Sequence, residues 1–237
     1  AFKPDRDELV VSTKAGYDMW PGPYGNWGSR KSLMASLDQS LARMGVDYVD
    51  VFYSHRYDPE TPLEETMQAL VDIVRQGKAL YVGLSKYPAD KAEEAYRYLE
   101  ARDVHCLLYQ GRYNLFDRAP EEEGILGQAR AYGGGFIAFS PLAQGLLTSR
   151  YLQGVPEDSR MAQGRFLKRE VLTEAVLGKI KALDRVAAER GQTLAEMSLA
   201  WVLKDELVTS VIIGASSVVQ LEDNLKALRK VDFSKEE

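Results

Sequence analysis

LVVSTKAG, at residues 9–16, is the stretch from which the fold of this chain can be read. Its apolar run, Leu9 to Val11, leads to Lys14, and a glycine follows two residues later. A second stretch, YVDVFYSH at residues 48–55, ends in the same way on His55. If both runs are strands of one parallel sheet, Lys14 and His55 emerge at the same edge, where α/β folds place their active sites. We therefore expect these two strand ends to carry the chemistry.

The rest of the chain repeats a short apolar strand followed by an amphipathic helix. We expect strands that start near residues 9, 48, 79, 104, 135 and 208, with at least one helix between consecutive strands. This alternation predicts right-handed βαβ units and a parallel sheet. Since no linker, low-complexity tract or charge block interrupts the pattern, residues 1–237 are expected to form a single α/β domain.

Several helix boundaries carry sequence signals. Ser29 is expected to cap a helix that Gly45 ends. Residues 61–64, TPLE, resemble a capping box with proline at the first helical position, and Gly77 stops that helix. Further helices are expected near 89–102, 121–132, 171–190 and 194–204, the last one opened by the box Thr193-x-x-Glu196. A serine in GASS, at 214–217, is expected to cap the final helix.

The composition excludes several classes of protein. A net charge of −5 and a pI near 5.3 argue against a nucleic-acid or anionic-membrane partner. No apolar run approaches the ~20 residues of a membrane helix, and the first residues contain no apolar signal-peptide core. Cys106 is the only cysteine, so we expect a buried thiol, no intrachain disulfide and a reducing, cytoplasmic setting. Two histidines and one cysteine form no metal-site pattern, and none is expected.

Polar residues stand at nearly every predicted strand end: Lys14, His55, Ser85, Gln110, Ser140 and Ser216. Contributions from many strands to one site are typical of a (β/α)8 barrel. An open dinucleotide-binding sheet would carry a G-x-G-x-x-G motif after its first strand, and this chain has none. Six strands are two short of closure. Because Gly214-Ala215-Ser216 looks like the terminal phosphate-binding turn of a barrel, we expect the deficit at the N-terminal end.

Four strings, taken together and in order, resemble the aldo-keto reductase superfamily: STKAGYDMWPGPYG at 12–25, YSHR at 53–56, FSPLAQGLLT at 139–148 and IGAS at 213–216. The resemblance covers essentially the whole chain. It is strongest to the branch with the bacterial glyceraldehyde-phosphate reductases and the β-subunits of voltage-gated potassium channels. It implies a (β/α)8 TIM barrel, expected here without its first two strands and its C-terminal helix.

The resemblance also implies a mechanism. In this family a tyrosine donates a proton to the substrate carbonyl as hydride arrives from NADPH, a lysine and an aspartate tune the tyrosine, and a histidine orients the carbonyl. Lys14 matches the lysine and His55 the histidine. A nearby cation makes a phenol a readier proton donor, and a neutral imidazole can donate a hydrogen bond to an oxygen that gains negative charge. The tyrosine and aspartate are expected upstream of Ala1, because Asp7 and Tyr17 do not match their positions.

The implied cofactor is NADP(H). By similarity, Ser85 and Gln110 bind its carboxamide, and Phe139 stacks on the nicotinamide ring. The resemblance assigns the pyrophosphate, the other phosphates and the adenosine end to a larger set: Ser140, Pro141, Leu142, Ala143, Gln144, Arg150, Arg160, Gly214, Ser216, Gln220, Asp223 and Asn224. A helix N-terminus suits Ser216, since free backbone N–H groups there bind anions.

The expected function is NADPH-dependent reduction of small aldehydes or ketones to alcohols, with L-glyceraldehyde 3-phosphate or methylglyoxal as candidate substrates and methylglyoxal detoxification as a possible role. Trp20 is expected to wall the substrate pocket, and Arg56 to contact a substrate anion. Two alternatives stay open: an NADP(H)-binding regulatory subunit with little turnover, and an inactive barrel fragment. The resemblance further implies a homo-oligomer.

Overall fold

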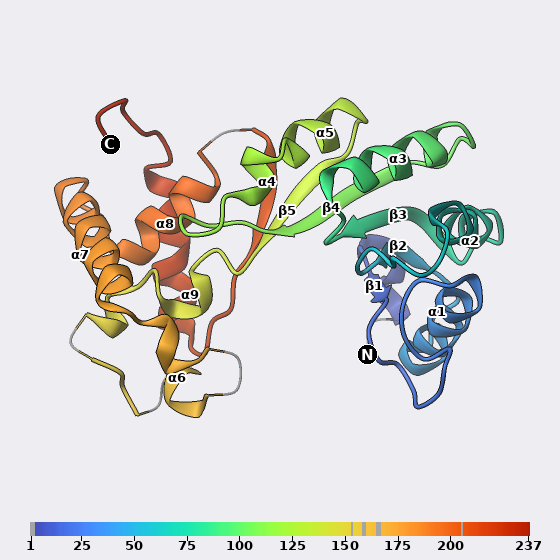
Figure 1. Ribbon diagram of the computed structural model, residues 1–237, viewed down its shortest axis with the longest axis horizontal. Helices are drawn as coiled ribbons and strands as arrows, with labels where there is room; N and C mark the ends of the chain where they lie inside the picture. Colours follow the sequence, from blue (N-terminus) through green and yellow to red (C-terminus); the bar gives the residue numbers. More distant parts are fainter. Residues whose placement is uncertain (1–2, 153, 158–159, 165–166, 205) are drawn as a thin grey trace. The chain divides into compact units, whose positions relative to one another are not determined.

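Figure 1 shows the computed structural model of the protein. The structure describes residues 3–152, 154–157, 160–164, 167–204 and 206–237. Six strands follow one another across the sheet in chain order: β1 (Ser12–Ala15), β2 (Val49–Ser54), β3 (Ala79–Ser85), β4 (Cys106–Arg112), β5 (Gly135–Phe139) and β6 (Val208–Ile212). The pairs β1–β2, β2–β3 and β3–β4 are parallel. At least one helix lies between each pair of consecutive strands, and two short helices lie between β4 and β5. The predicted α/β class is therefore confirmed, and the arrangement is that of part of a (β/α)8 barrel.

The chain forms two compact units. Unit 1 comprises residues 1–111 and 121–136, and unit 2 comprises residues 112–120 and 137–237. The single domain expected for residues 1–237 stays a prediction.

Unit 1 contains β1 to β4 and the helices α1 (Arg30–Met44), α2 (Leu63–Arg75), α3 (Ala89–Glu100) and α5 (Ile125–Ala131). Its core is made by the apolar faces of strands and helices, with Phe52, Met67, Leu70 and Leu84 fully buried. Ser29 caps α1, because its side chain accepts a hydrogen bond from the Ser32 N–H, and Gly45 ends the helix at φ 67°. Both predicted boundaries of α1 are confirmed.

The capping box predicted at residues 61–64 is wrong. Pro62 is the N-cap of α2 and no side chain caps the helix. The Thr61 hydroxyl donates instead to a carboxylate oxygen of Asp58, 2.6 Å away. Asp58 is buried and also accepts hydrogen bonds from the backbone N–H groups of Gly28 and Glu60. A buried carboxylate is a stronger acceptor than a neutral group, so it binds the threonine that the pattern assigned to the helix.

Three predicted boundaries move for local reasons. The first strand begins at Ser12, three residues after its predicted start, because the Val11 N–H donates to the Asp50 side chain and Val10 is 80% exposed. The fourth strand begins at Cys106, because the Val104 N–H still closes the end of α3 on Leu99. The helix expected near 121–132 is divided into α4 (Ala119–Glu122) and α5.

Unit 2 contains β6, most of β5 and the helices α6 (Arg160–Gln163), α7 (Glu174–Glu189), α8 (Leu194–Val202) and α9 (Val218–Leu225). The capping box Thr193–Glu196 of α8 is present in full, and Ser217 caps α9. Both predictions are confirmed. The core of this unit includes Leu146, Tyr151, Ile180 and Met197.

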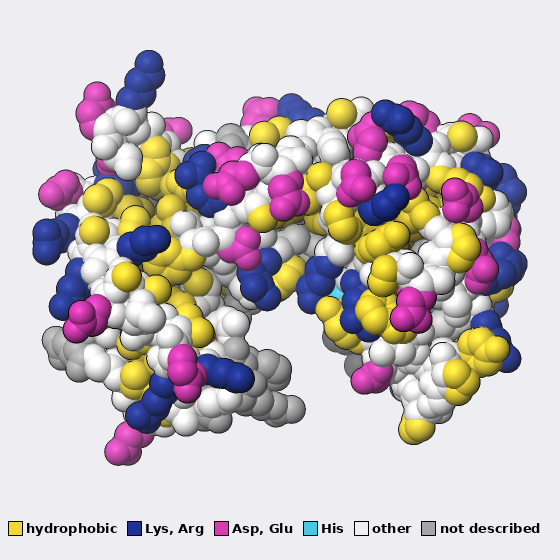
Figure 2. Space-filling view, viewed as in Figure 1, with side chains coloured by type: hydrophobic (Ala, Val, Ile, Leu, Met, Phe, Trp, Pro, Cys, Tyr) yellow, Lys and Arg dark blue, Asp and Glu magenta, His cyan; other side chains and the backbone are white. Residues whose placement is uncertain are grey.

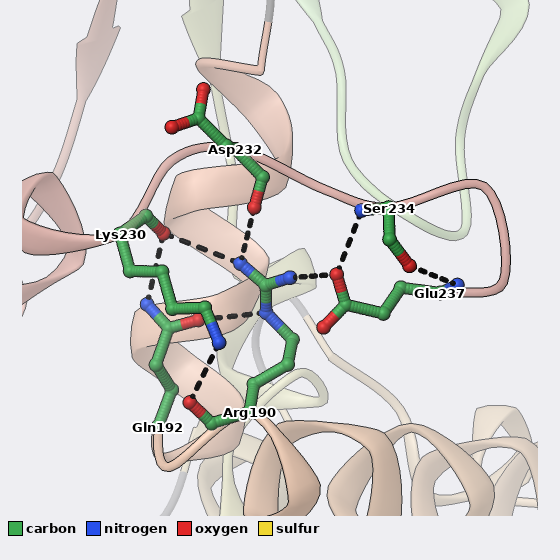
Figure 3. A network of polar contacts seen from close by, with 6 residues as sticks. All are labelled: Arg190, Gln192, Lys230, Asp232, Ser234 and Glu237. Carbon is green, nitrogen blue, oxygen red and sulfur yellow. Dashed lines mark hydrogen bonds and ion pairs between the residues drawn. The ribbon is translucent and has the colours of Figure 1, made fainter.

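Arg190, which follows α7, holds residues 230–237 against unit 2 (Figure 3). Its fully buried guanidinium donates to the backbone oxygens of Lys230 and Asp232, at 3.3 and 2.9 Å, and to the side chains of Gln192 and Glu237. The Lys230 ammonium returns a hydrogen bond to the Arg190 carbonyl oxygen. This network is the main polar tie of the segment to the rest of the unit.

The distribution of surface charge and the burial of Cys106 are as expected from the sequence. Figure 2 shows acidic and basic side chains interspersed on the face that it presents, without a large area of one sign. No helix in the described part of the chain is both long and apolar enough to cross a bilayer. Cys106 is buried, as predicted, and burial raises the pKa of its thiol to about 12.

Candidate functional site

Lys14 lies in a row of residues that crosses three strands of unit 1. In the parallel register, Lys14 of β1 pairs with Tyr53 of β2, and Tyr53 pairs with Gly83 of β3. The Lys14 ammonium lies 4.7 Å from the centroid of the Tyr53 ring. A Cβ atom on residue 83 would lie 2.4 Å from carbons of the same ring. Gly83 therefore leaves the space in which the ring lies beside Lys14.

The predicted residues on β3 and β4 meet Lys14. Its ammonium donates a hydrogen bond to Oε1 of Gln110, on β4. Ser85, the last residue of β3, is buried and stands opposite Gln110 in the register. Burial lowers the pKa of the Lys14 ammonium, because desolvation disfavours the charged form. The structure thus brings Lys14, Ser85 and Gln110 to neighbouring strand ends.

His55 follows β2 directly. Its backbone N–H donates to the Ala15 carbonyl oxygen at 2.8 Å, and Gly16, at φ 139°, lets the chain pass close to the histidine. Burial is the main reason that its pKa falls to about 4, and the positive charges of Lys14, Lys86 and Arg56 lower it further. At neutral pH the imidazole is therefore uncharged, and one of its ring nitrogens carries a hydrogen that it can donate.

Tyr17 lies among the cations of this site and was not among the site residues predicted from the sequence. Its ring meets the His55 ring edge-on, with centroids 4.7 Å apart. The Lys86 ammonium donates to its hydroxyl at 2.8 Å, and the Arg56 guanidinium lies 4.2 Å from its ring centroid. The signal was available, since Tyr17 stands inside the matched string at 12–25.

Arg56 connects the site to the loop after β1. Its Nε donates to the Gly16 carbonyl oxygen at 2.7 Å, and its Nη2 donates to the Asn26 side chain at 2.8 Å. Its guanidinium also lies 3.6 Å from the centroid of the Trp27 ring. Trp27 and Tyr17 thus make the ring contacts described for this arginine, whereas none is described for Trp20, a half-buried residue earlier in the loop.

Unit 2 contains a pocket of about 500 Å³ that collects many of the predicted cofactor residues. The predicted residues on its wall are Ser140, Pro141, Leu142, Gln144, Arg150, Gly214 and Gln220. Sequence reasoning missed the others: Gly145, Thr148, Ser149, Tyr151, Ile212 and Ile213. All of these lie inside the matched strings or within a few residues of them.

The loop after β5 forms one wall of this pocket in an unusual backbone conformation. Ser140, Ala143 and Gln144 have φ values of 55°, 46° and 61°, although none is glycine. The buried Asn114 side chain donates to the Ser140 carbonyl oxygen at 3.0 Å, and the Ala143 N–H donates to the same oxygen. Backbone strain of this kind persists where the surroundings impose it, and it is frequent at ligand sites.

Two predicted cofactor residues keep buried polar atoms without a hydrogen-bond partner among the described residues. They are Oε1 of Gln144, on the pocket wall, and Nδ2 of Asn224, in α9. Buried polar atoms are rarely left unpaired, so each can take part in binding a ligand. On the pocket wall, the unpaired Gln144 oxygen suits a hydrogen-bond donor of a ligand and the cationic Arg150 suits a phosphate.

The remaining predicted residues lie elsewhere or are engaged. Ser216 donates through its N–H and its hydroxyl to the Gln220 side chain, and Asp223 pairs with Lys226 at 2.6 Å. Phe139 ends β5, and Ala143 lines a different cavity of unit 2. The Arg160 side chain lies outside the described residues. In the part of the chain that the structure covers, no three His, Cys, Asp or Glu side chains form a group that could hold a metal ion.

Comparison with known proteins identifies relatives along the full chain. The model of the Aldo/keto reductase family matches residues 1–237. L-glyceraldehyde 3-phosphate reductase of Escherichia coli O157:H7 is 53% identical over 240 residues, which cover 100% of this chain and 69% of the relative. The protein of the same name from strain K12 is 52% identical. A probable voltage-gated potassium channel subunit beta of Arabidopsis thaliana is 38% identical over 94% of this chain and 69% of its own length.

Proposed function

Because the chain belongs to the aldo/keto reductase family, we propose that it is an NADP(H)-dependent oxidoreductase that reduces small aldehydes or ketones to alcohols. The observation that carries the proposal is the uncharged His55 beside Lys14 at the ends of two neighbouring parallel strands. This arrangement offers a hydrogen-bond donor and a cation in one place, and a carbonyl oxygen needs both as it gains negative charge.

The residues of unit 1 have separate roles in this proposal. His55 donates a ring N–H to the substrate carbonyl oxygen, which orients the carbonyl and stabilises the alkoxide as it forms. Lys14, which donates a hydrogen bond to Gln110, places a positive charge near the carbonyl oxygen. The same charge would favour proton release from the hydroxyl of the family's catalytic tyrosine if that hydroxyl lies beside the ammonium. Ser85 and Gln110 orient the carboxamide of the cofactor, which supplies the hydride when it is bound.

The residues of unit 2 bind the rest of the cofactor in this proposal. Arg150 pairs with a phosphate, and the loop from Ser140 to Gln144 follows the pyrophosphate. Gly214 and Gln220 line the same pocket, and Asn224 offers its unpaired side-chain N–H to the adenosine end. Phe139, Ser216, Asp223 and Arg160 keep the cofactor roles that the resemblance implies.

The proposed substrates are small and anionic or strongly polarised. L-glyceraldehyde 3-phosphate is the first candidate, since a relative that is 53% identical bears that substrate in its name, and methylglyoxal is the second. Arg56 is the proposed anion contact, because its Nη1 has no acceptor among the described residues while Nε and Nη2 hold it in place. Trp20 is proposed to wall the pocket. An Arg56→Ala change should lower kcat/KM for the phosphorylated aldehyde more than for glyceraldehyde, and equal losses would remove this assignment.

The relatives that are named as potassium channel β-subunits support a second candidate function. In it, the chain binds the cofactor but turns over little substrate, and it regulates a partner that it binds stably. The two functions differ in one measurement, because only the enzyme oxidises bound NADPH at a rate that rises with aldehyde concentration.

The test is a titration with NADPH followed by its fluorescence, combined with turnover. Lys14→Met should leave the NADPH affinity within about twofold and remove most of the turnover, because the lysine acts on the carbonyl and not on the phosphates. The control is Lys91→Met, which removes a half-buried lysine of α3 that pairs with Glu94 of the same helix. Absence of NADPH binding by the unaltered protein would contradict the family function. Retained turnover in Lys14→Met would contradict the role of Lys14.

Location and assembly are proposed on the same basis. We expect a cytoplasmic protein that forms a homo-oligomer and that binds neither nucleic acid nor membrane. Sedimentation velocity over a range of concentrations checks the assembly, and a single monomeric species would contradict it.

A further inference from the structure

Unit 2 has a second cavity, of about 800 Å³, whose wall includes Ser140, Ala143 and Gln144 of the loop assigned to the pyrophosphate but none of the other predicted cofactor residues. It lies between the loop after β4, the loop after β5 and residues 176–183 of α7. Leu115, Phe116, Val176 and Leu183 are among its walls. All four are partly buried and pack against the core of the unit, so their remaining apolar surface faces the cavity. The volume and the apolar lining are those of a site for a small organic molecule.

The cavity has a cation at its rim. Lys179 of α7 lines it, is exposed, and forms no ion pair with any described residue. The other charged side chains on its wall are Arg112 and Asp117. Nη1 of Arg112 lies 3.8 Å from Oδ2 of Asp117, so their opposite charges offset each other. The net charge that the cavity presents is therefore the positive charge of Lys179.

We propose that this cavity binds an amphipathic carboxylate, with its hydrocarbon part between α7 and the loop residues Leu115 and Phe116 and its carboxylate at Lys179. The hydrocarbon would cover apolar surface that is otherwise in contact with water. The carboxylate would pair with the lysine at the rim, where it stays partly hydrated and loses little solvation. A neutral hydrocarbon would gain only the first of these contributions, and a cation would be repelled.

The cavity is separate from the pocket assigned to the cofactor. Of the two sets of wall residues, only Ser140 and Gln144 are common. Ala182, an exposed residue of α7, is on the wall of the second cavity and not on that of the first. A large side chain at position 182 therefore enters the second cavity from its own wall and is not on the wall of the first one.

Isothermal titration of the full chain with sodium octanoate, and separately with 1-octanol, tests the proposal. Octanoate should bind at one site. Lys179→Met should weaken octanoate by about threefold to fivefold, the effect of one exposed ion pair, and leave 1-octanol within about twofold. Ala182→Trp should weaken both by more than about tenfold, because the indole occupies the hydrocarbon site. High salt should reduce the effect of Lys179→Met.

The matched control is Lys181→Met, which removes an exposed lysine from the same helix but not from the cavity wall. It should leave octanoate binding unchanged, and the thermal midpoints of all three variants should confirm that they fold. Absence of octanoate binding would overturn the proposal, as would binding that Ala182→Trp leaves intact. Equal effects of the lysine changes at 179 and 181 would show a general charge effect and would overturn the assignment of Lys179.

Discussion

At the scale of single residues, His55 shows how burial and neighbouring charge set a protonation state. The folded chain holds its pKa near 4, against 6.5 for an ordinary histidine, because burial and three nearby cations disfavour the imidazolium. Between these two values the unfolded chain binds a proton at this position and the folded chain does not. The free energy of unfolding therefore falls as the pH falls from about 6.5 toward 4.

This difference predicts the effect of His55→Gln on the pH dependence of stability. The variant cannot bind a proton at this position, so its free energy of unfolding should fall less than that of the unaltered protein between about pH 7 and about pH 5. Urea unfolding at the two pH values measures the difference. His105→Gln, at an exposed position, is the control and should keep the slope of the unaltered protein. Equal slopes for His55→Gln and the unaltered protein would show that His55 is not held neutral in the fold.

At the scale of elements, β1, β2 and β3 act together to place Lys14. The ammonium lies beside the Tyr53 ring, and the ring occupies the space that Gly83 leaves open. No sequence pattern revealed this dependence, because it joins residues 14, 53 and 83 through the register of two strand pairs. The position of Lys14, the candidate catalytic residue, thus depends on the space that Gly83 leaves for the Tyr53 ring.

Gly83→Ala should therefore lower the stability and also disturb the site. The new methyl group would meet the buried Tyr53 ring, and forcing that ring aside costs about 1–3 kcal/mol. Thermal and urea unfolding measure the loss. Gly178→Ala is the matched control, since it lies in α7 with open space around its position and should stabilise the helix by about 0.5–1 kcal/mol. A neutral result for Gly83→Ala would mean that the ring can move freely.

The signals that predicted elements correctly are local ones. Ser29 with Gly45, and Thr193 with Glu196, act within one or two turns of their own helix, and the structure has them as predicted. The box at 61–64 failed, because Asp58 lies outside the pattern and binds Thr61 more strongly. The short length of β1 was equally hidden, since the Asp50 side chain that takes the Val11 N–H comes from another strand.

At the scale of the whole molecule, the order of strands and helices and the strand-end residues could be predicted, because they follow from alternation along the chain. The Arg56 contacts and the second cavity of unit 2 could not be predicted, whereas the pocket assigned to the cofactor was predicted in part. Arg56 acts through Asn26 and Trp27, which lie about thirty residues away, and the second cavity brings α7 together with the loops after β4 and β5, which are distant in the chain. Tertiary contacts of this kind are set by the packed chain and not by local propensity.

Arg190 offers a prediction at this scale, because it joins two distant parts of unit 2. Arg190→Met should keep the length of the side chain but leave the Asp232 carbonyl oxygen without its donor and the Lys230 carbonyl oxygen with Gln192 as its remaining donor. We expect the free energy of unfolding to fall by about 2–3 kcal/mol and the backbone amides of residues 230–237 to exchange hydrogen faster. Arg185→Met, on an exposed position of α7, should change neither. Unchanged exchange in residues 230–237 would show that apolar contacts alone hold the segment.

The loop from Ser140 to Gln144 lines two cavities, and its residues Ser140 and Gln144 are on the walls of both. Three of its five residues hold positive φ values that are rare for residues other than glycine. If an occupant of one cavity alters the affinity of the other by some factor, thermodynamics requires the same factor in return. Ser140 and Gln144 are the wall residues through which such a coupling would pass, and it would have the same size in both directions.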